Sequence, residues 1–302
     1  MTENDENLKR AILRALDGLL SSLQPEALGG DRFRVHSEAN RFGRVFGGQM
    51  VAQAMQAAAT TVSDKPPHSL HAYFVKSGDP GHPLEIAVER IRDGRSMAAR
   101  RVTVTQGGEP LLITMVSFHD NPSEPEFAEP APAGPTPEGL PRLQDWVKTA
   151  PPELQERART WISRPPPAEI RIAEPTYFFG GSRGTGSRSH WMRLPRDVGD
   201  DPVLHSVLLA YASDYLLLDI ALRSHPDPVS VESSTAFSLD HSLWLHRPVR
   251  FDRWHSHTAE LVSVSGHPHR PHSPDDAQPS RAPQSSRLVL DQVVEVDLPE
   301  LR

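Results

Sequence analysis

Cysteine is absent from this sequence: none of its 302 residues is a cysteine. Disulfide bonds, thiolate zinc sites and thiol nucleophiles are therefore excluded. Long apolar runs are also missing, and no stretch is expected to reach the roughly 18 residues of a membrane span. The net charge is −7, and the 32 basic residues form no lysine-rich run. No nucleic acid partner is expected, because binding one requires a concentrated basic face.

The N-terminus lacks the basic residues of a signal peptide, and Glu3, Asp5 and Glu6 make it acidic. Together with the absence of cysteine, this predicts a cytoplasmic protein. Proline, in contrast, is abundant, with 30 residues. Residues 121–142 combine many prolines with acidic residues, which is typical of a linker.

The first 120 residues follow an α+β pattern. Leucine and isoleucine recur at helical spacing over residues 4–23, and a second helix-like run begins at Gly47-Gly48. Over residues 68–119 the apolar positions alternate, and turn signals with glycine separate the runs. The pattern predicts an antiparallel sheet that curls around one helix.

A second unit of helix followed by strands comes later in the chain, with its helix over residues 203–223. The tripeptide His-Ser-Leu occurs once in each unit, after the helix and at the start of an aromatic-containing strand. This repeat, at 68–70 and 241–243, predicts a duplicated fold. The predicted domains are residues 1–120, a linker over 121–165, and residues 166–264.

Residues 265–302 do not fit this plan. Five prolines between positions 268 and 283 remove strand donors, and the alternation ends. Translation in a shifted reading frame produces such an abrupt change, and the alternative is a genuine, disordered tail. Only residues 288–298 keep a strand-like pattern. Three histidines of this tail are interpreted as solvent-exposed, so no metal site is expected: His267, His269 and His272.

Asp214 is the most informative single residue. It lies within the apolar segment 203–222, whose composition predicts a helix buried on all sides. Burying an ionised carboxylate costs several kcal/mol, so Asp214 must be paired, protonated or exposed to a polar cleft. A cleft carboxylate of this kind is a candidate acid–base group. The alternative is a carboxylate satisfied by Ser213 or by water.

Four motifs resemble those of the type II acyl-CoA thioesterase family, and with residues 211–217 the resemblance covers about residues 30–255. They are Val45-Phe46-Gly47-Gly48-Gln49; residues 68–74 with Gly78-Asp79-Pro80; Arg92-Asp93-Gly94-Arg95-Ser96 with Arg100-Arg101-Val102; and residues 239–248. The resemblance implies two hotdog folds in one chain, a double hotdog. It also implies hydrolysis of acyl-CoA thioesters to a fatty acid and CoA, no cofactor, and a homo-oligomer.

The resemblance further implies a catalytic set of an Asp in the second hotdog helix, a Thr or Ser on the next strand, and a Gln near the C-terminus. Asp214 and Ser238 stand where the first two belong. In such a site Asp214 takes a proton from a water molecule that Ser238 helps to hold. The family's Gln motif is absent, and none of the candidates is assigned: Gln278, Gln284 and Gln292.

The expected substrate-binding residues are Gly47, Gly48, Gln49 and His71. Backbone N–H groups after the glycine pair open a helix and are suited to polarise a carbonyl or contact CoA phosphates. Alternatively, the glycines only permit close packing between helix and sheet. For His71, a structural histidine bonded to the backbone is an equally acceptable interpretation.

Two other functions stay open. A chain that kept the fold but lost the third catalytic residue would be a non-catalytic acyl-CoA or lipid-binding protein. The sequence 180–184 matches the G-x-S-x-G motif of serine hydrolases around Ser182, but no helix pattern follows it, which favours a plain loop. His255 and His257 alternate on a predicted strand and are expected to face solvent.

Overall fold

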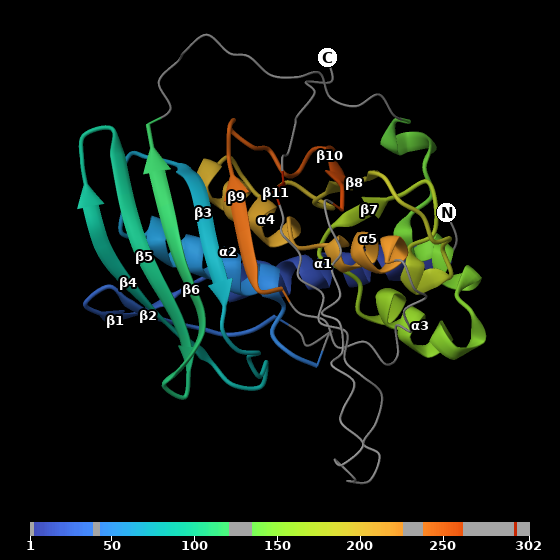
Figure 1. Cartoon of the computed structure of the whole chain (residues 1–302), viewed down its shortest axis with the longest axis horizontal. Coiled ribbons are helices and arrows are strands. Elements are labelled where there is room, and N and C mark those ends of the chain that lie inside the picture. The colour runs from blue at the N-terminus through green and yellow to red at the C-terminus, as the bar shows by residue number, and fades with distance from the viewer. Residues whose placement is uncertain (1–2, 39–42, 121–134, 226–237, 262–292, 295–302) are drawn as a thin grey trace, which may run out of the picture.

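The computed structural model describes residues 3–38, 43–120, 135–225, 238–261 and 293–294. They form an eight-stranded sheet and a three-stranded sheet, and helices lie between the two (Figure 1). The strand order of the large sheet is β1-β2-β4-β5-β6-β3-β9-β11, and that of the small sheet is β10-β8-β7. This is the α+β layout that the sequence predicts.

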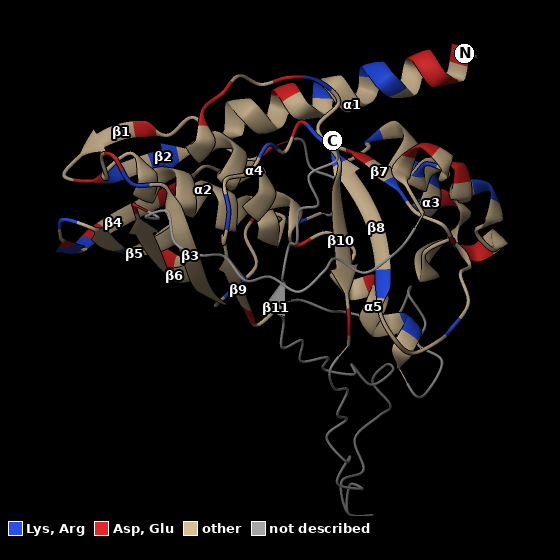
Figure 2. Cartoon of the chain, turned by 90° about the horizontal axis from the view of Figure 1, so that it is seen from above, with Lys and Arg blue, Asp and Glu red and all other residues tan. Residues whose placement is uncertain are grey.

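The N-terminal unit confirms the predicted helices and alternating strands. Nearly every residue of its central helix, α2, is buried against the curled sheet. The elements are α1 (Glu3–Ser22), β1 (Glu26–Gly29), β2 (Arg32–Val35), α2 (Gly47–Ala59), β3 (Pro67–Phe74), β4 (Leu84–Asp93), β5 (Met97–Gln106) and β6 (Glu109–His119). Figure 2 shows that α2 carries no charged residue whereas α1, at the edge of the molecule, carries several.

The segment between the units is more structured than a linker. Short helices occupy most of residues 137–163, and Leu143, Val147 and Ala158 from them are buried in the core. Arg142 in this segment also pairs with Asp5 of α1 at 2.7 Å. The helices are η1 (Pro137–Gly139), η2 (Leu143–Thr149), η3 (Pro152–Leu154) and α3 (Gln155–Ser163).

The second unit repeats the N-terminal arrangement only in part. Its strands β7 and β8 pair as β1 and β2 do, and β8 pairs with β10 as β2 pairs with β4. The elements are β7 (Glu169–Arg171), η4 (Tyr177–Phe179), β8 (Arg188–Arg193), α4 (Pro202–Ala212), α5 (Leu217–Ser224), β9 (Asp240–Trp244), β10 (His255–Ala259) and β11 (Val293–Val294).

The two His-Ser-Leu tripeptides meet where the units join. Strands β3 and β9 pair antiparallel, with Leu70 opposite Leu243. On either side of this pair, Ser69 lies opposite Trp244 and His71 lies opposite Ser242. Each copy therefore occupies the same position relative to the other, as an approximate twofold axis requires. This register confirms that the echo in the sequence marks a duplicated fold.

Residues 202–224 correct the expectation that no apolar stretch reaches the length of a membrane span. Among the described residues, this stretch is the one that is long and apolar enough to cross a membrane by length and composition alone. The stretch is mostly buried inside the protein and is interrupted after Ala212. It is a core element, as its all-round apolar surface predicts.

The histidines of β10 correct another expectation. His255 and His257 alternate as predicted, but both are buried rather than facing solvent. The ring of His257 stacks on that of His190 on β8, with 5.1 Å between centroids, and the rings of His255 and His257 each make an edge contact with Phe251. Alternation alone gives the period of a strand and does not decide which face is inside.

Candidate active site

Asp214 lies in a break between two helices. The sequence predicts one continuous helix over 203–223, and this prediction is wrong because α4 ends at Ala212 and α5 begins at Leu217. Leu216 has φ 62°, a left-handed conformation that a leucine adopts only under tertiary constraint. At this break the Asp214 carboxylate points toward the start of α2.

The glycine pair of α2 allows this carboxylate to approach. Asp214 Oδ2 accepts a hydrogen bond from the N–H of Gly48 at 2.9 Å. A Cβ atom at Gly47 would stand 2.7 Å from Asp214 Oδ2, and one at Gly48 would stand 2.4 Å from the carbonyl oxygen of Tyr211. Glycine is therefore required here by close approach of the two helices.

Burial raises the pKa of Asp214 to about 7, while the Gly48 N–H and the charge of Arg44 act in the opposite direction. An ordinary aspartate has a pKa near 4. A carboxyl group whose pKa lies near neutrality can both accept and release a proton under physiological conditions, which suits a general base.

Asp214 and Ser238 line the same cavity, which has a volume of about 460 Å³. Gly47 lines it as well, so three of the predicted site residues converge there. Most of the wall is apolar and aromatic, and the cationic residues on it are Arg44, Lys76 and Arg157. A cavity with an apolar wall, a few cations and one carboxyl group suits a ligand that has both an acyl chain and phosphates.

Gly48 and Gln49 serve the fold and the carboxylate rather than lining this cavity. The N–H groups of Gln49 and Met50 donate to the carbonyl oxygen of Phe46, and that of Gly48 donates to Asp214. These three donors are therefore occupied within the protein. The buried Gln49 side chain donates to Gln53 Oε1 and accepts from the backbone N–H of Glu38.

His71 is also placed away from the cavity. Its neighbours on β3, Leu70 and Ala72, are buried, while His71 is exposed on the opposite face of the sheet. The His71 ring lies 3.1 Å from Ser242 Oγ and makes an edge contact with Trp244 on β9. These contacts join the two units across the β3–β9 seam.

Asp219 is a residue that the sequence reasoning missed. It is buried in the first turn of α5, where it accepts from the N–H of Tyr177 at 2.5 Å and pairs with Arg188 at 3.1 Å. Burial raises its pKa to about 6, so it is ionised at neutral pH. Asp219 thereby fixes η4, whose Phe178 and Phe179 line the cavity. Its signal was a second carboxylate in the same apolar segment.

The remaining candidates are Ser182, metal ligands and the histidines and glutamines of the C-terminal tail. Ser182 is exposed in a loop between η4 and the strand β8, so the G-x-S-x-G motif lacks the strand before it and the helix after it. No group of three or more metal-ligating side chains occurs among the described residues. The tail histidines and the three C-terminal glutamines named above lie outside those residues.

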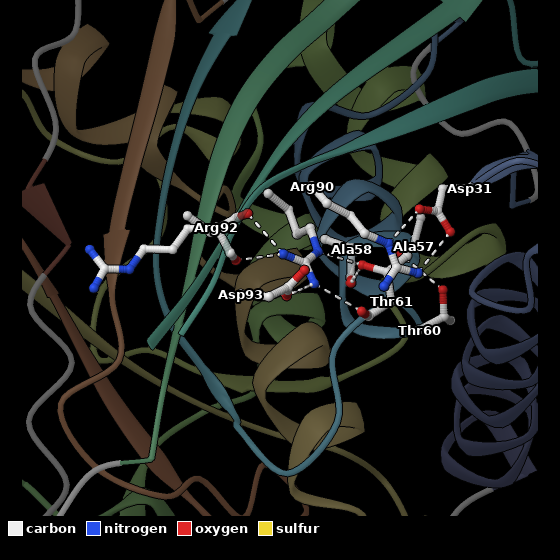
Figure 3. Close-up of polar contacts among 10 residues, drawn as sticks. Asp31, Ala57, Ala58, Thr60, Thr61, Arg90, Arg92 and Asp93 are labelled. Atoms are coloured by element: carbon white, nitrogen blue, oxygen red, sulfur yellow. Dashed lines mark hydrogen bonds and ion pairs between the residues drawn. The ribbon is translucent and has the colours of Figure 1, made fainter. Parts of the chain in front are cut away.

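The Arg-Asp-Gly motif has a structural function. Arg100 is buried, and its guanidinium donates to Thr61 Oγ1, to the Thr61 carbonyl oxygen and to Asp93 Oδ1. Thr61 and Asp93 are labelled in Figure 3. It also donates to the carbonyl oxygen of Arg92. A cation at the C-terminal end of α2 is favourable to the helix dipole, so Arg100 anchors α2 to the sheet.

Comparison with known proteins agrees with this architecture. Residues 35–119 match the model of the acyl-CoA thioesterase N-terminal domain, and residues 162–269 match that of acyl-CoA thioesterase. Human acyl-coenzyme A thioesterase 8 is 36% identical over 253 residues, which cover 81% of this chain and 79% of the relative.

Two solved structures share the fold. A tesB protein of Mycobacterium avium subsp. paratuberculosis is 28% identical with a TM-score of 0.67, and the match covers 83% of this chain and 88% of that one. A hotdog protein from Alicyclobacillus acidocaldarius is 18% identical with a TM-score of 0.61, covering 83% and 87%. The second likeness concerns the fold alone and confirms the double hotdog.

Proposed function

The chain belongs to the type II acyl-CoA thioesterase family, and from this premise we propose that Asp214 is the base with which it hydrolyses acyl-CoA thioesters. The single observation that carries the proposal is a carboxyl group of pKa about 7 at the wall of a largely apolar cavity. A thioester carbonyl is electrophilic enough for an oriented, partly deprotonated water to attack it.

In the proposed reaction, the water oxygen bonds to the carbonyl carbon while Asp214 accepts one of the water protons. The carbon–sulfur bond then breaks, and CoA leaves as the thiol after taking up a proton. Ser238, on the same cavity wall, is the hydroxyl that holds the water by a hydrogen bond. The Gly48 N–H keeps the Asp214 carboxylate in place.

The charge of the cavity supports the same substrate. Arg44, Lys76 and Arg157 supply positive charge at its wall, and CoA carries negatively charged phosphates. The aromatic and leucine side chains around them suit an acyl chain, because burying apolar surface drives its binding. The proposed reaction requires no covalent intermediate between the enzyme and the substrate.

The decisive variant is Asp214→Asn. It keeps the size of the side chain and removes the base, so release of CoA, measured with a thiol reagent, should fall by at least about a hundredfold. Asp64→Asn is the matched control, since Asp64 is exposed in a turn after α2 with φ 63°, which asparagine tolerates. Wild-type rates in Asp214→Asn, with an unchanged circular dichroism spectrum, would refute the assignment.

A non-catalytic acyl-CoA-binding protein is the second candidate. It is favoured by one observation: the described residues supply Asp214 and Ser238 but hold no counterpart of the family's C-terminal glutamine motif. Loss of one orienting group typically lowers a rate by about 10²–10³ without abolishing it. Calorimetric binding of acyl-CoA with no release of thiol by the wild-type chain would establish this alternative.

We also propose that the chain forms a homo-oligomer. The outer face of the large sheet exposes three large apolar side chains on neighbouring strands, Tyr73, Met97 and Met115. Such a face is a site for association with a second copy. Light scattering coupled to gel filtration measures the mass directly, and a strictly monomeric chain would contradict this proposal.

A further inference from the structure

Helix α3 belongs to neither repeated unit, yet it forms one wall of the cavity. Arg157, Ala158, Thr160 and Trp161 line the cavity from this helix. The next residue, Ile162, is 44% exposed and does not line it. Along the long axis of the molecule, α5 lies between α2 and α3 (Figure 1). Helix α3 and Gly47, at the start of α2, therefore supply different parts of the wall of the same cavity.

An apolar surface connects Asp214 to this wall. It begins with Leu217, at the start of α5, and continues with Phe178 and Phe179 of η4. Trp161 of α3 comes next, with its ring in a T-shaped contact with that of Phe179, 5.9 Å between centroids and 88° between planes. Apolar and aromatic side chains thus follow one another from the carboxyl group to the indole.

Hydrogen bonds and packing hold this surface in place. Asp219 fixes η4 to α5 by accepting from the Tyr177 N–H. Helix α3 is anchored by Ala158, which is 1% exposed, and by the Gln155 side chain, which donates to the carbonyl oxygen of Ala150. A wall that cannot move aside discriminates between ligands of different length, because an additional group has no space to occupy.

We propose that Trp161 forms the far end of the acyl-binding part of the cavity and sets the longest acyl chain that fits. This inference rests on the proposed thioesterase function. Each methylene that packs on an apolar wall strengthens binding by about fourfold, until the end of the chain meets the indole. Of the three cations on the cavity wall, Arg44 precedes α2 and Lys76 follows β3, so two of them lie away from α3, whereas Arg157 lies on α3 itself.

The test compares kcat/KM across saturated straight-chain acyl-CoAs from acetyl to palmitoyl, with thiol release as the signal. In Trp161→Ala the preferred chain becomes longer, and the ratio of the longest to the shortest substrate rises at least about tenfold. Ala158→Leu narrows the same wall and shifts the preference toward shorter chains. Ile162→Ala, on the outer side of α3, leaves the profile unchanged and serves as the matched control.

Three results would overturn the inference. An unchanged length profile in Trp161→Ala and Ala158→Leu, with thermal melts that show both variants folded, would reject it while the thioesterase function stands. A uniform loss across all chain lengths, with weaker inhibition by free CoA, would assign Trp161 and Arg157 to the nucleotide instead. A wild-type chain that hydrolyses none of the substrates would remove the proposed function and the inference together.

Discussion

The two halves of the chain share a topology but differ in the continuity of their sheets. In the N-terminal unit, β1-β2-β4 continues through β5 and β6 to β3. In the second unit, β7-β8-β10 repeats the first three strands and β9 repeats β3, but the described residues hold no counterpart of β5 and β6. Strand β9 pairs with β3 on one side and with the two-residue strand β11 on the other. Among the described residues, the sheet of the second unit is therefore less continuous than that of the first.

The central helices differ in a way that agrees with the proposed position of the catalytic base. Helix α2 is continuous and packs through small residues, which makes it a scaffold. Its counterpart is divided into α4 and α5, and the break presents Asp214. If Asp214 is the base, the duplicated fold assigns stability to one copy and reactivity to the other, because the two functions place opposite demands on a buried helix.

The largest effect is expected from a substitution at Gly48, where α2 lies against α4 and Asp214. In Gly48→Ala, the new Cβ would collide with the Tyr211 carbonyl oxygen and displace Asp214. We expect a loss of about 3 kcal/mol in the free energy of unfolding and about a hundredfold in turnover. Denaturant titration and the thiol assay measure these. Gly18→Ala, where no atom lies within 4 Å in α1, should gain up to about 1 kcal/mol. Equal stability of Gly48→Ala and wild type would contradict the argument.

The scaffold role of the first unit is tested by Arg100→Met. The change leaves Asp93 and the end of α2 without their cation and should cost about 2–3 kcal/mol of unfolding free energy. Arg101→Met is the control on the next residue, since Arg101 is exposed and pairs with Glu89 at 3.4 Å, worth about 0–1 kcal/mol. The expectation fails if the two variants unfold at the same denaturant concentration.

Low pH should destabilise the second unit more than the N-terminal unit. Burial lowers the pKa of His190 to about 3 and also lowers that of His257. Below pH 6.5 the unfolded chain binds protons that the folded chain excludes, so stability is complete above pH 6.5 and falls toward pH 4. We expect a loss on the order of 2 kcal/mol by pH 4.

Hydrogen exchange locates this loss. Amides of β8 and β10 should lose protection before those of β5 and β6 as the pH falls. His190→Phe, which removes one buried titrating group, should flatten the response. Simultaneous loss of protection in both units would show that the histidine pair does not control acid stability.

The smallest expected effect concerns the pH dependence of turnover. With a pKa of about 7, Asp214 is mostly protonated at pH 6 and mostly ionised at pH 8, so the rate should rise about tenfold over this interval. The same shift means that the stability of the fold falls as the pH rises from the unfolded pKa of 3.8 to about 7, and this loss persists above pH 7. Asp214→Asn should therefore be slightly more stable than wild type at pH 8. A rate that does not change from pH 6 to pH 8 would exclude this carboxyl as the base.

The helices and strands of the N-terminal unit could be predicted because their periodicity reports burial directly. The repeated tripeptide likewise predicted a duplicated fold, and only the structure placed its two copies where the units join. Other features escaped the sequence because they depend on distant partners. The left-handed turn at Leu216 shows no local breaker, and the outward orientation of His71 follows from the face that β3 presents to α2.

What the sequence by itself determined is the duplicated α+β layout and the presence of a carboxyl group at position 214 among apolar residues. Tertiary structure decided what that carboxyl group contacts, which glycine must admit it, and which helix closes its cavity. The physical reason is that periodicity specifies which residues are buried, whereas the pKa, the partners and the shape of a cavity depend on atoms that come from distant parts of the chain.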